Sequence, residues 1–285
     1  MKTRVFAVCL VVFLFCGITH AGLSDGLVAY YPFNGNANDE SGHGNNGIVN
    51  GATLTTDRNG NVNSAYSFDG VNSCIDLTST TVAIQGNADR TVTAWIKTTF
   101  TGWQAIVATG VPVHHQAFNV VMYNYSSSGC GGHVGVMRYD DDFVPCGGSS
   151  GIVSTDGAWH MMAVVYDGLG TLRIYADGIL DNETSITYAT TGQKNYIGRS
   201  NHVGYECPFR GSIDEVRIYN RALSSAEIQQ LYRGQGTCSN DIVTFTAGTP
   251  AKAADVNANF DLLRCQMQAM KTAFCQEHPT ASMCQ

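Results

Sequence analysis

The sequence predicts an all-β fold in which two antiparallel sheets pack face to face, followed by a short C-terminal helical tail. From residue 27 to residue 219 the chain is a series of short strand-like segments separated by glycine, asparagine and aspartate. The 31 glycines supply the turns that so many short strands require. About 200 residues of this pattern, with almost no helix, can bury a large core between two sheets.

Individual segments support this prediction. Residues 91–97 alternate between apolar and polar, which is typical of a strand with one buried face. Residues 159–166 are apolar on both faces, as expected for a central strand that is covered on both sides. Residues 172–180 read as a hairpin, because Asp177-Gly178 accepts the positive φ angles of a tight turn.

A short helix is predicted directly after the strands. Residues 224–227 form a capping box, and Leu223 and Ile228 are placed as its hydrophobic staple. Leu231 and Tyr232 would dock this helix on the sandwich. The glycines that follow place a domain boundary near residue 237, so the domain spans residues 22–236.

The tail, residues 237–285, carries a heptad-like apolar seam whose members are spaced 4, 3, 4, 3 and 4 residues apart: Val256, Phe260, Leu263, Met267, Met270 and Phe274. A lone helix of this length is marginal in water. The helix must therefore pack on its own sandwich or associate with other copies, and we expect homo-oligomer formation through residues 251–275.

Residues 1–21 have the features of a signal peptide. Lys2 and Arg4 form a basic start, residues 5–18 an apolar run, and Ala21 ends a small-residue exit after which cleavage is predicted. The run is short for a membrane span, and no other stretch of the sequence qualifies. We therefore expect a secreted or cell-surface protein that is not inserted in a membrane.

Cysteine content agrees with export. Removing residues 1–21 takes Cys9 and Cys16 from the ten cysteines and leaves eight, an even number that predicts disulfides. No CxxC pair is present, which disfavours a zinc site. Cys130 and Cys146 could close one loop, and Cys275 and Cys284 could staple the C-terminus, but the connectivity stays open. The candidates are Cys74, Cys130, Cys146, Cys207, Cys238, Cys265, Cys275 and Cys284.

The formal net charge of the chain is negative. Loss of Lys2 and Arg4 with the leader takes the formal net charge from −7 to −9. This balance argues against nucleic acid or anionic lipid as a partner and suits cations and neutral glycans.

A series of short sequence motifs makes residues 27–232 resemble the LamG-like jellyroll domains of the concanavalin A-like lectin/glucanase superfamily. In order they are Tyr31-Pro-Phe-Asn-Gly35, Asp39-Glu-Ser-Gly-His-Gly-Asn-Asn-Gly47, Ser67-Phe-Asp-Gly70, Val92-Thr-Ala-Trp95, Trp159-His160, Tyr175-Ala-Asp-Gly178, Ile197-Gly198 and Ile213-Asp-Glu-Val-Arg-Ile-Tyr-Asn-Arg-Ala-Leu-Ser224. The resemblance implies a two-sheet jellyroll. It also implies that the domain binds sugars or proteins, or that it is an accessory module of glycosidases and sialidases. Such domains often hold a structural calcium. Residues 245–260 are similar to a segment of bacterial surface and fibre-like proteins, which implies a bacterial source.

Calcium is the predicted cofactor, in a structural role. If its strand is regular, Asp214 shares the core-facing side with Val216 and Ile218, where a carboxylate needs a partner. Asp39 and Asn34 could bring oxygen ligands from the opening loop, and related jellyrolls imply a cation joining these two chain ends. The alternative is that Asp214 pairs with a basic residue such as Arg217 or Arg221, or bonds to the backbone of a turn.

Aromatic and acidic side chains are candidates for ligand binding, because aromatic faces stack on the apolar faces of pyranose rings. Tyr139, Asp141 and Phe143 lie in the loop between Cys130 and Cys146. The alternatives are a solvated loop tip and ordinary aromatic packing. The further platform candidates are Trp103, Tyr123, Tyr125 and Tyr205.

Catalysis is not expected. Glucanases of the resembled superfamily carry Glu-x-Asp-x-x-Glu or Glu-x-Asp-x-Glu on one strand, and the sequence contains neither run. The serines, histidines and aspartates form no nucleophile elbow. We therefore expect a non-catalytic carbohydrate-binding module. The first rival is a structural or adhesive display domain that binds an extracellular protein, and the second is a cryptic hydrolase. The sequence does not name the glycan.

Overall fold

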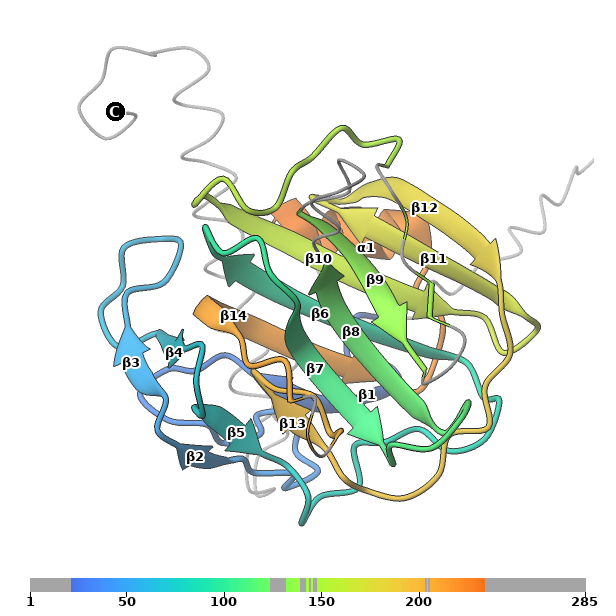
Figure 1. Cartoon of the computed structure of the whole chain (residues 1–285), viewed down its shortest axis with the longest axis horizontal. Coiled ribbons are helices and arrows are strands. Elements are labelled where there is room, and N and C mark those ends of the chain that lie inside the picture. The colour runs from blue at the N-terminus through green and yellow to red at the C-terminus, as the bar shows by residue number, and fades with distance from the viewer. Residues whose placement is uncertain are drawn as a thin grey trace, which may run out of the picture.

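The protein forms a two-layer β-sandwich in a computed structural model that describes residues 22–123, 132–138, 142–143, 145, 148–202, 204 and 206–233. Both sheets are antiparallel, and one short helix lies on the outer side of the larger sheet (Figure 1). This confirms the predicted jellyroll-like, all-β fold. The elements are β1 (Leu27–Tyr31), β2 (Ile48–Asn50), β3 (Thr53–Thr55), β4 (Ala65–Asp69), β5 (Cys74–Asp76), β6 (Arg90–Lys97), β7 (Gln104–Gly110), β8 (Ala117–Tyr123), β9 (His133–Met137), β10 (Trp159–Tyr166), β11 (Thr171–Ala176), β12 (Ile179–Ser185), β13 (Tyr196–Ile197), β14 (Arg210–Tyr219) and α1 (Ser225–Arg233).

The larger sheet has eight strands in the order β12-β11-β10-β6-β14-β4-β3, and β1 joins it by pairing with β14. The smaller sheet has six strands in the order β2-β5-β13-β7-β8-β9. Because β14 pairs with β1, β4 and β6, the end of the domain is hydrogen-bonded directly to its beginning.

The core lies between the inner faces of the two sheets. Val92 and Ile96 of β6 are buried there on one face, as predicted, but Trp95 on the opposite face is buried as well, so the strand has two buried faces and not one. In β10, Val164 faces this core, whereas Val165 faces a second cluster under α1, so the strand is covered on both sides as predicted. Burying a side chain of this size contributes roughly 1.5–3 kcal/mol.

Helix α1 begins as its sequence predicts. The Ser224 N–H donates to Glu227 Oε2 over 2.8 Å, and the Glu227 N–H donates back to Ser224 Oγ over 3.3 Å. Leu223 and Ile228 are both buried in the cluster beneath the helix. Among the described residues, no helix has the length and apolar character needed to cross a membrane.

The hairpin turn between β11 and β12 is also as predicted. Asp177 and Gly178 have φ angles of 49° and 78°. A Cβ atom at Gly178 would lie 3.2 Å from Tyr232 of α1, so both the backbone conformation and the neighbouring helix favour glycine here.

The two described cysteines differ from the disulfide prediction. Cys74 and Cys207 are free. They belong to different surroundings, because the Cys74 thiol bonds with Arg199 and Asn50, whereas Cys207 packs against the cluster that contains Tyr123 and Met137. The other candidates lie outside the described residues, and for them pairing stays a prediction: Cys130, Cys146, Cys238, Cys265, Cys275 and Cys284.

Candidate functional site

A β-bulge in β14 changes the face on which Asp214 lies. The pairing of β14 with β6 shifts register between Asp214 and Arg217, and Glu215 within the bulge has a φ of 52°. Val216 points into the core, but Asp214 lies opposite Trp95, which belongs to the outer cluster. The prediction that Asp214 shares the core-facing side is therefore wrong, because the extra residue reverses the alternation.

Asp214 pairs with a basic residue, as the alternative held, but that residue is Arg58 and neither Arg217 nor Arg221. The Asp214 Oδ2 atom lies 3.2 Å from the Arg58 guanidinium, and the Oδ1 atom accepts the Glu215 N–H over 2.7 Å. Arg58 lies over the Trp95 ring, 4.4 Å from its centroid. Burial and the neighbouring Glu215 charge raise the pKa of Asp214 to about 8, although Arg58 opposes this shift.

Glu215 has the opposite character to its neighbour. Its Oε2 lies 2.5 Å from Arg217 and accepts the Tyr30 hydroxyl over 3.0 Å. Burial would raise the pKa of Glu215, but the charges of Arg217 and Arg58 lower it overall. One acid of the pair thus holds a proton where the other is charged, as in many acid–base sites. However, the Asp214 side chain is only 2% exposed, which keeps it from touching a substrate.

Asp39 organises the loop after β1. Its carboxylate accepts the backbone N–H groups of Tyr30, Ser41 and Asn45 at 2.8 to 2.9 Å. Asn34 lies on the exposed part of the same loop, and its backbone carbonyl, not its side chain, accepts a bond.

The predicted calcium ligands therefore belong to separate networks. The oxygens of Asp39 bind backbone N–H groups, whereas Asp214 faces a cation and has a raised pKa. This arrangement does not fit one calcium ion shared by the two chain ends. Within the described ranges, no three His, Cys, Asp or Glu side chains gather in one place.

Two of the predicted aromatic residues do come together. Trp103 and Tyr123 pack edge to face with their ring centroids 4.2 Å apart, and Cys207 and Met137 complete the cluster on the smaller sheet. Tyr123 is only 1% exposed and covers Gly135, where a Cβ atom would lie 2.4 Å from the ring. Tyr123 is thus a packing residue, whereas Trp103 is half-buried.

Of the remaining ligand candidates, one lies in the described part of the chain and the others lie outside it. Phe143 exchanges two backbone hydrogen bonds of 3.0 Å with Val136 and packs partly against the core. The others lie outside the described residues: Tyr125, Tyr139, Asp141 and Tyr205.

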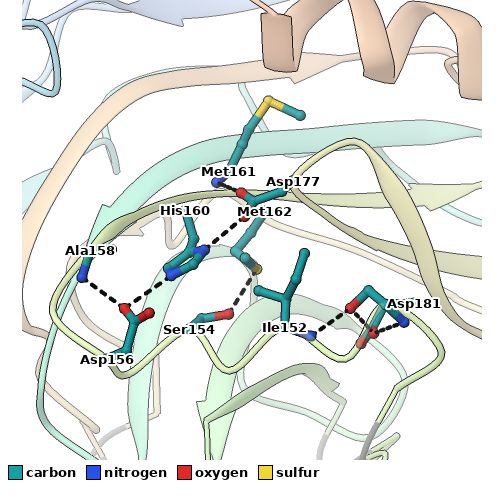
Figure 2. Close-up of polar contacts among 10 residues, drawn as sticks. Ile152, Ser154, Asp156, Ala158, His160, Met161, Met162, Asp177 and Asp181 are labelled. Carbon is teal, nitrogen blue, oxygen red and sulfur yellow. Dashed lines mark hydrogen bonds and ion pairs between the residues drawn. The ribbon is translucent and has the colours of Figure 1, made fainter. Parts of the chain in front are cut away.

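His160 is held between two carboxylates (Figure 2). Its Nδ1 lies 2.8 Å from Asp177 Oδ2, and its Nε2 lies 3.0 Å from Asp156 Oδ1. A neutral imidazole has one N–H, so both bonds are satisfied only by the imidazolium form. Burial opposes that form, but the bonds to Asp177 and Asp156 raise the pKa of His160. The ring therefore offers no free nitrogen to act as a base.

The nearby serine is not a nucleophile partner of this histidine. Ser154 Oγ faces Met162 Sδ at 3.7 Å and does not bond to His160 (Figure 2). Asp181 ties the preceding loop to β12, because its carboxylate accepts hydrogen bonds from the N–H and hydroxyl of Ser150. We call this region, residues 148–160 with Asp177 and Asp181, the clamped end.

A groove of 440 Å³ opens at the other end of β10–β12. Three separate segments line it: the residue after β9, the β10–β11 turn and the end of β12. Its lining residues are Arg138, Leu169, Gly170, Thr171, Ser185, Ile186 and Thr187. Sequence reasoning missed all of them, because no local pattern joins the three segments. The only sequence signal for this groove was the nearby acidic loop, which contains Asp142. The Asp142 Oδ1 atom accepts the Arg138 N–H over 2.8 Å.

Comparisons with known proteins agree with this architecture. A family model described as the concanavalin A-like lectin/glucanases superfamily matches residues 68–229. The chain is similar to domain 4 of AbnA, a GH43 extracellular arabinanase from Geobacillus stearothermophilus, solved in complex with arabinotriose. That likeness has a TM-score of 0.53 and 21% identity, and it covers 72% of this chain and 98% of that chain.

Two further solved structures share the fold over part of their length. The receptor binding domain of botulinum neurotoxin D is similar with a TM-score of 0.54 and 16% identity, over 80% of this chain and 57% of that chain. A mutant Trypanosoma rangeli sialidase displaying trans-sialidase activity has a TM-score of 0.55 and 18% identity, over 75% of this chain and 33% of that chain. At these identities the likeness concerns the fold alone. No curated protein matches the chain.

Proposed function

The chain belongs to the concanavalin A-like lectin/glucanase superfamily, and we propose that it is an exported, non-catalytic carbohydrate-binding module. The observation that carries the proposal is the fold shared with an arabinanase domain solved with arabinotriose, 98% of which the chain covers. Because one fold hosts many functions, the side chains must also be weighed.

The ionisable side chains support binding over hydrolysis. Glycoside hydrolysis needs two carboxyl groups that reach opposite sides of a glycosidic bond. Asp214 is buried beneath Arg58, and Glu215 is engaged by Arg217 and Tyr30. The imidazole of His160 has a carboxylate at each nitrogen. These groups are held in contacts that stabilise the fold.

Export rests on residues 1–21, and self-association rests on the apolar seam in residues 251–275. Several copies held together would raise the apparent affinity for a polymeric glycan that presents many equivalent sites. The disulfides of the tail would suit the same extracellular setting. Calcium has no part in the binding proposal, because Asp39 and Asp214 belong to separate networks.

The alternative is a display domain that binds an extracellular protein. The likeness to the receptor binding domain of botulinum neurotoxin D favours it, because that relative uses the same fold in receptor binding. In this alternative the sandwich carries no affinity for sugar, and the tail sets the number of copies displayed.

A thermal melt of the chain without residues 1–21 separates these possibilities. The oxidised protein is heated with calcium or with EDTA, and again with each of a panel of soluble polysaccharides. A ligand that binds only the folded state raises the melting temperature. A rise with one glycan class, without cleavage of that glycan, is the expected result. Cleavage would favour a hydrolase, and no response to any glycan would favour the display domain. The EDTA arm tests the calcium prediction separately.

A further inference from the structure

We propose that removal of the signal peptide creates a charged N-terminus for which the folded domain has a receiving group: the α-ammonium of Gly22 pairs with the carboxylate of Asp25. This inference rests on the export part of the proposed function, in which the chain is cleaved after Ala21. The pair forms within the domain itself, so it is independent of any sugar.

Residues 22–25 form a turn in which the nitrogen of Gly22 already faces a carboxylate. The Gly22 N–H donates to Asp25 Oδ2 over 2.8 Å, and the Asp25 N–H donates to the Gly22 carbonyl over 3.0 Å. Hydrolysis of the bond between Ala21 and Gly22 adds one water molecule and leaves a carboxylate on Ala21 and an ammonium on Gly22. The ammonium is therefore formed at a position where an N–H already donates to Asp25, and no movement of the turn is needed.

Arg221, which directly precedes the segment leading into α1, holds this turn in place. Its guanidinium donates to the Gly22 carbonyl over 2.9 Å and to the Asp25 carbonyl over 2.6 Å. The fixed fork of a guanidinium suits two acceptors at once. Leu23 packs partly against the cluster beneath α1. The position of the Gly22 nitrogen is thus set by contacts with a residue 199 positions later in the sequence.

The charges at this turn favour an ammonium over the amide that it replaces. In the uncleaved chain the Gly22 N–H is neutral, whereas in the cleaved chain both donor and acceptor are charged, which strengthens the contact. The Arg221 cation opposes a nearby ammonium, but it is itself paired with Glu227 of α1 at 2.7 Å. Gly22 and Asp25 are both exposed, so the gain is that of a surface ion pair and is screened by salt. Such a pair holds the amine in its protonated form, which does not react as a nucleophile.

Acylation of the new amine tests this pair in the chain exported by a bacterial host with its own residues 1–21. Mass spectrometry of the exported protein first identifies its N-terminal residue. A small activated ester is then applied at about pH 7, and labelling of the N-terminal amine is compared with labelling of exposed Lys97 in the same sample. Asp25→Asn removes the charge and keeps an oxygen that can accept the same hydrogen bond. Glu206→Gln is the matched control, because it removes a carboxylate that pairs with Arg199 elsewhere on the surface.

Gly22 should be the N-terminal residue of the exported protein. Its amine should be labelled about threefold faster in Asp25→Asn than in wild type or Glu206→Gln, because an exposed ion pair shifts the protonated fraction by this order. The three rates should converge at about pH 10, where the amine is unprotonated in every variant, and the difference should shrink in about 1 M salt.

Equal labelling of wild type and Asp25→Asn at about pH 7 would overturn the pairing. A difference that persists at about pH 10 would overturn it as well, because the side chain would then only shield the amine. A different N-terminal residue would overturn the processing site while export stands. A chain that keeps residues 1–21 would contradict the export prediction together with this inference, and the carbohydrate-binding proposal would be unaffected by any of these results.

Discussion

The two ends of the β10–β12 sheet region differ in how their polar side chains are used. At the clamped end, His160, Asp156, Asp177 and Asp181 bond to one another or to the adjoining backbone. At the groove end, buried Arg138 and Tyr188 lie beneath a rim of exposed hydroxyls and an exposed leucine. The same strands thus end in a closed polar network on one side and in a rigid, open surface on the other.

Ionisable groups attract attention in a sequence, but in this fold those with the most perturbed environments stabilise loops and strands. Structural networks perturb pKa values as active sites do. The groove instead joins three segments that are distant in the sequence, and it carries exposed hydroxyl groups and an exposed leucine.

Arg90→Lys is expected to give the largest loss of stability that does not depend on pH, because it removes a buried guanidinium that has several acceptors. The Arg90 guanidinium donates to the Ile84 carbonyl, the Gly86 carbonyl and Thr190 Oγ1 at 2.7 to 2.8 Å. Lysine cannot reach all of these acceptors from one nitrogen, and each buried acceptor left without a donor is costly. We expect a loss of about 3 kcal/mol in the free energy of unfolding, measured by urea denaturation.

The matched control for this change is Arg173→Lys. Arg173 is partly exposed and pairs with Glu183 at 2.6 Å on the surface of β11 and β12. Such pairs contribute at most about 1 kcal/mol. Equal losses for the two variants would contradict the view that the groove end depends on its buried guanidinium.

Asp214→Asn tests a carboxyl group that lies outside both ends and holds a proton because of its burial and the neighbouring Glu215 charge. Its pKa is raised from 3.8 to about 8 on folding, so the folded protein keeps a proton that the unfolded chain releases. This contribution to stability is complete below pH 4 and is lost as the pH rises towards 8, by at most about 1.4 kcal/mol per pH unit.

The asparagine variant should lose this part of the slope, measured as the free energy of unfolding at each pH from 4 to 8. A lost hydrogen bond would shift its curve by a constant amount, so the slope is the informative quantity. Glu206→Gln is the control, because the Glu206 carboxylate is partly exposed and pairs with Arg199 at 2.8 Å. Parallel curves for wild type and Asp214→Asn would show that Asp214 is charged in the fold.

His160→Gln removes the imidazolium at the clamped end and should have the smallest effect on stability of the three substitutions. Bonds to Asp177 and Asp156 raise the pKa of His160 above 6.5 even though burial opposes them, so the imidazolium stabilises the folded state. That stabilisation is complete below pH 6.5 and is lost as the pH rises through the higher pKa of the folded protein. At pH 6 we expect the variant to be less stable by about 1–2 kcal/mol.

The difference between His160→Gln and wild type should shrink as the pH rises from 6 to 9, as measured by urea denaturation at each pH. His43→Gln, which changes an exposed histidine, is the matched control. A difference that stays constant with pH would mean that the two carboxylates do not hold His160 as a cation.

Much of the fold followed from patterns within a few residues. The capping box of Ser224 and Glu227 and the Asp177-Gly178 turn formed as predicted, because each depends on bonds or φ angles between near neighbours. The face of β6 that lies against the core was also predicted correctly, since a regular strand repeats every two residues. For the candidate site, the sequence brought attention to the loop beside Arg138, and it correctly raised aromatic packing as an alternative for Tyr123.

Only the tertiary structure decided which side chains lie together. One extra residue at Glu215 reversed the face of Asp214, and such a bulge depends on how β14 pairs with its neighbours. The groove joins Arg138, Leu169 and Thr187 from three segments, and their closeness depends on strand order and register. The sequence by itself determined the elements and the family, because local bonding and alternation suffice for those. The site required the pairing of distant strands, which no local pattern specifies.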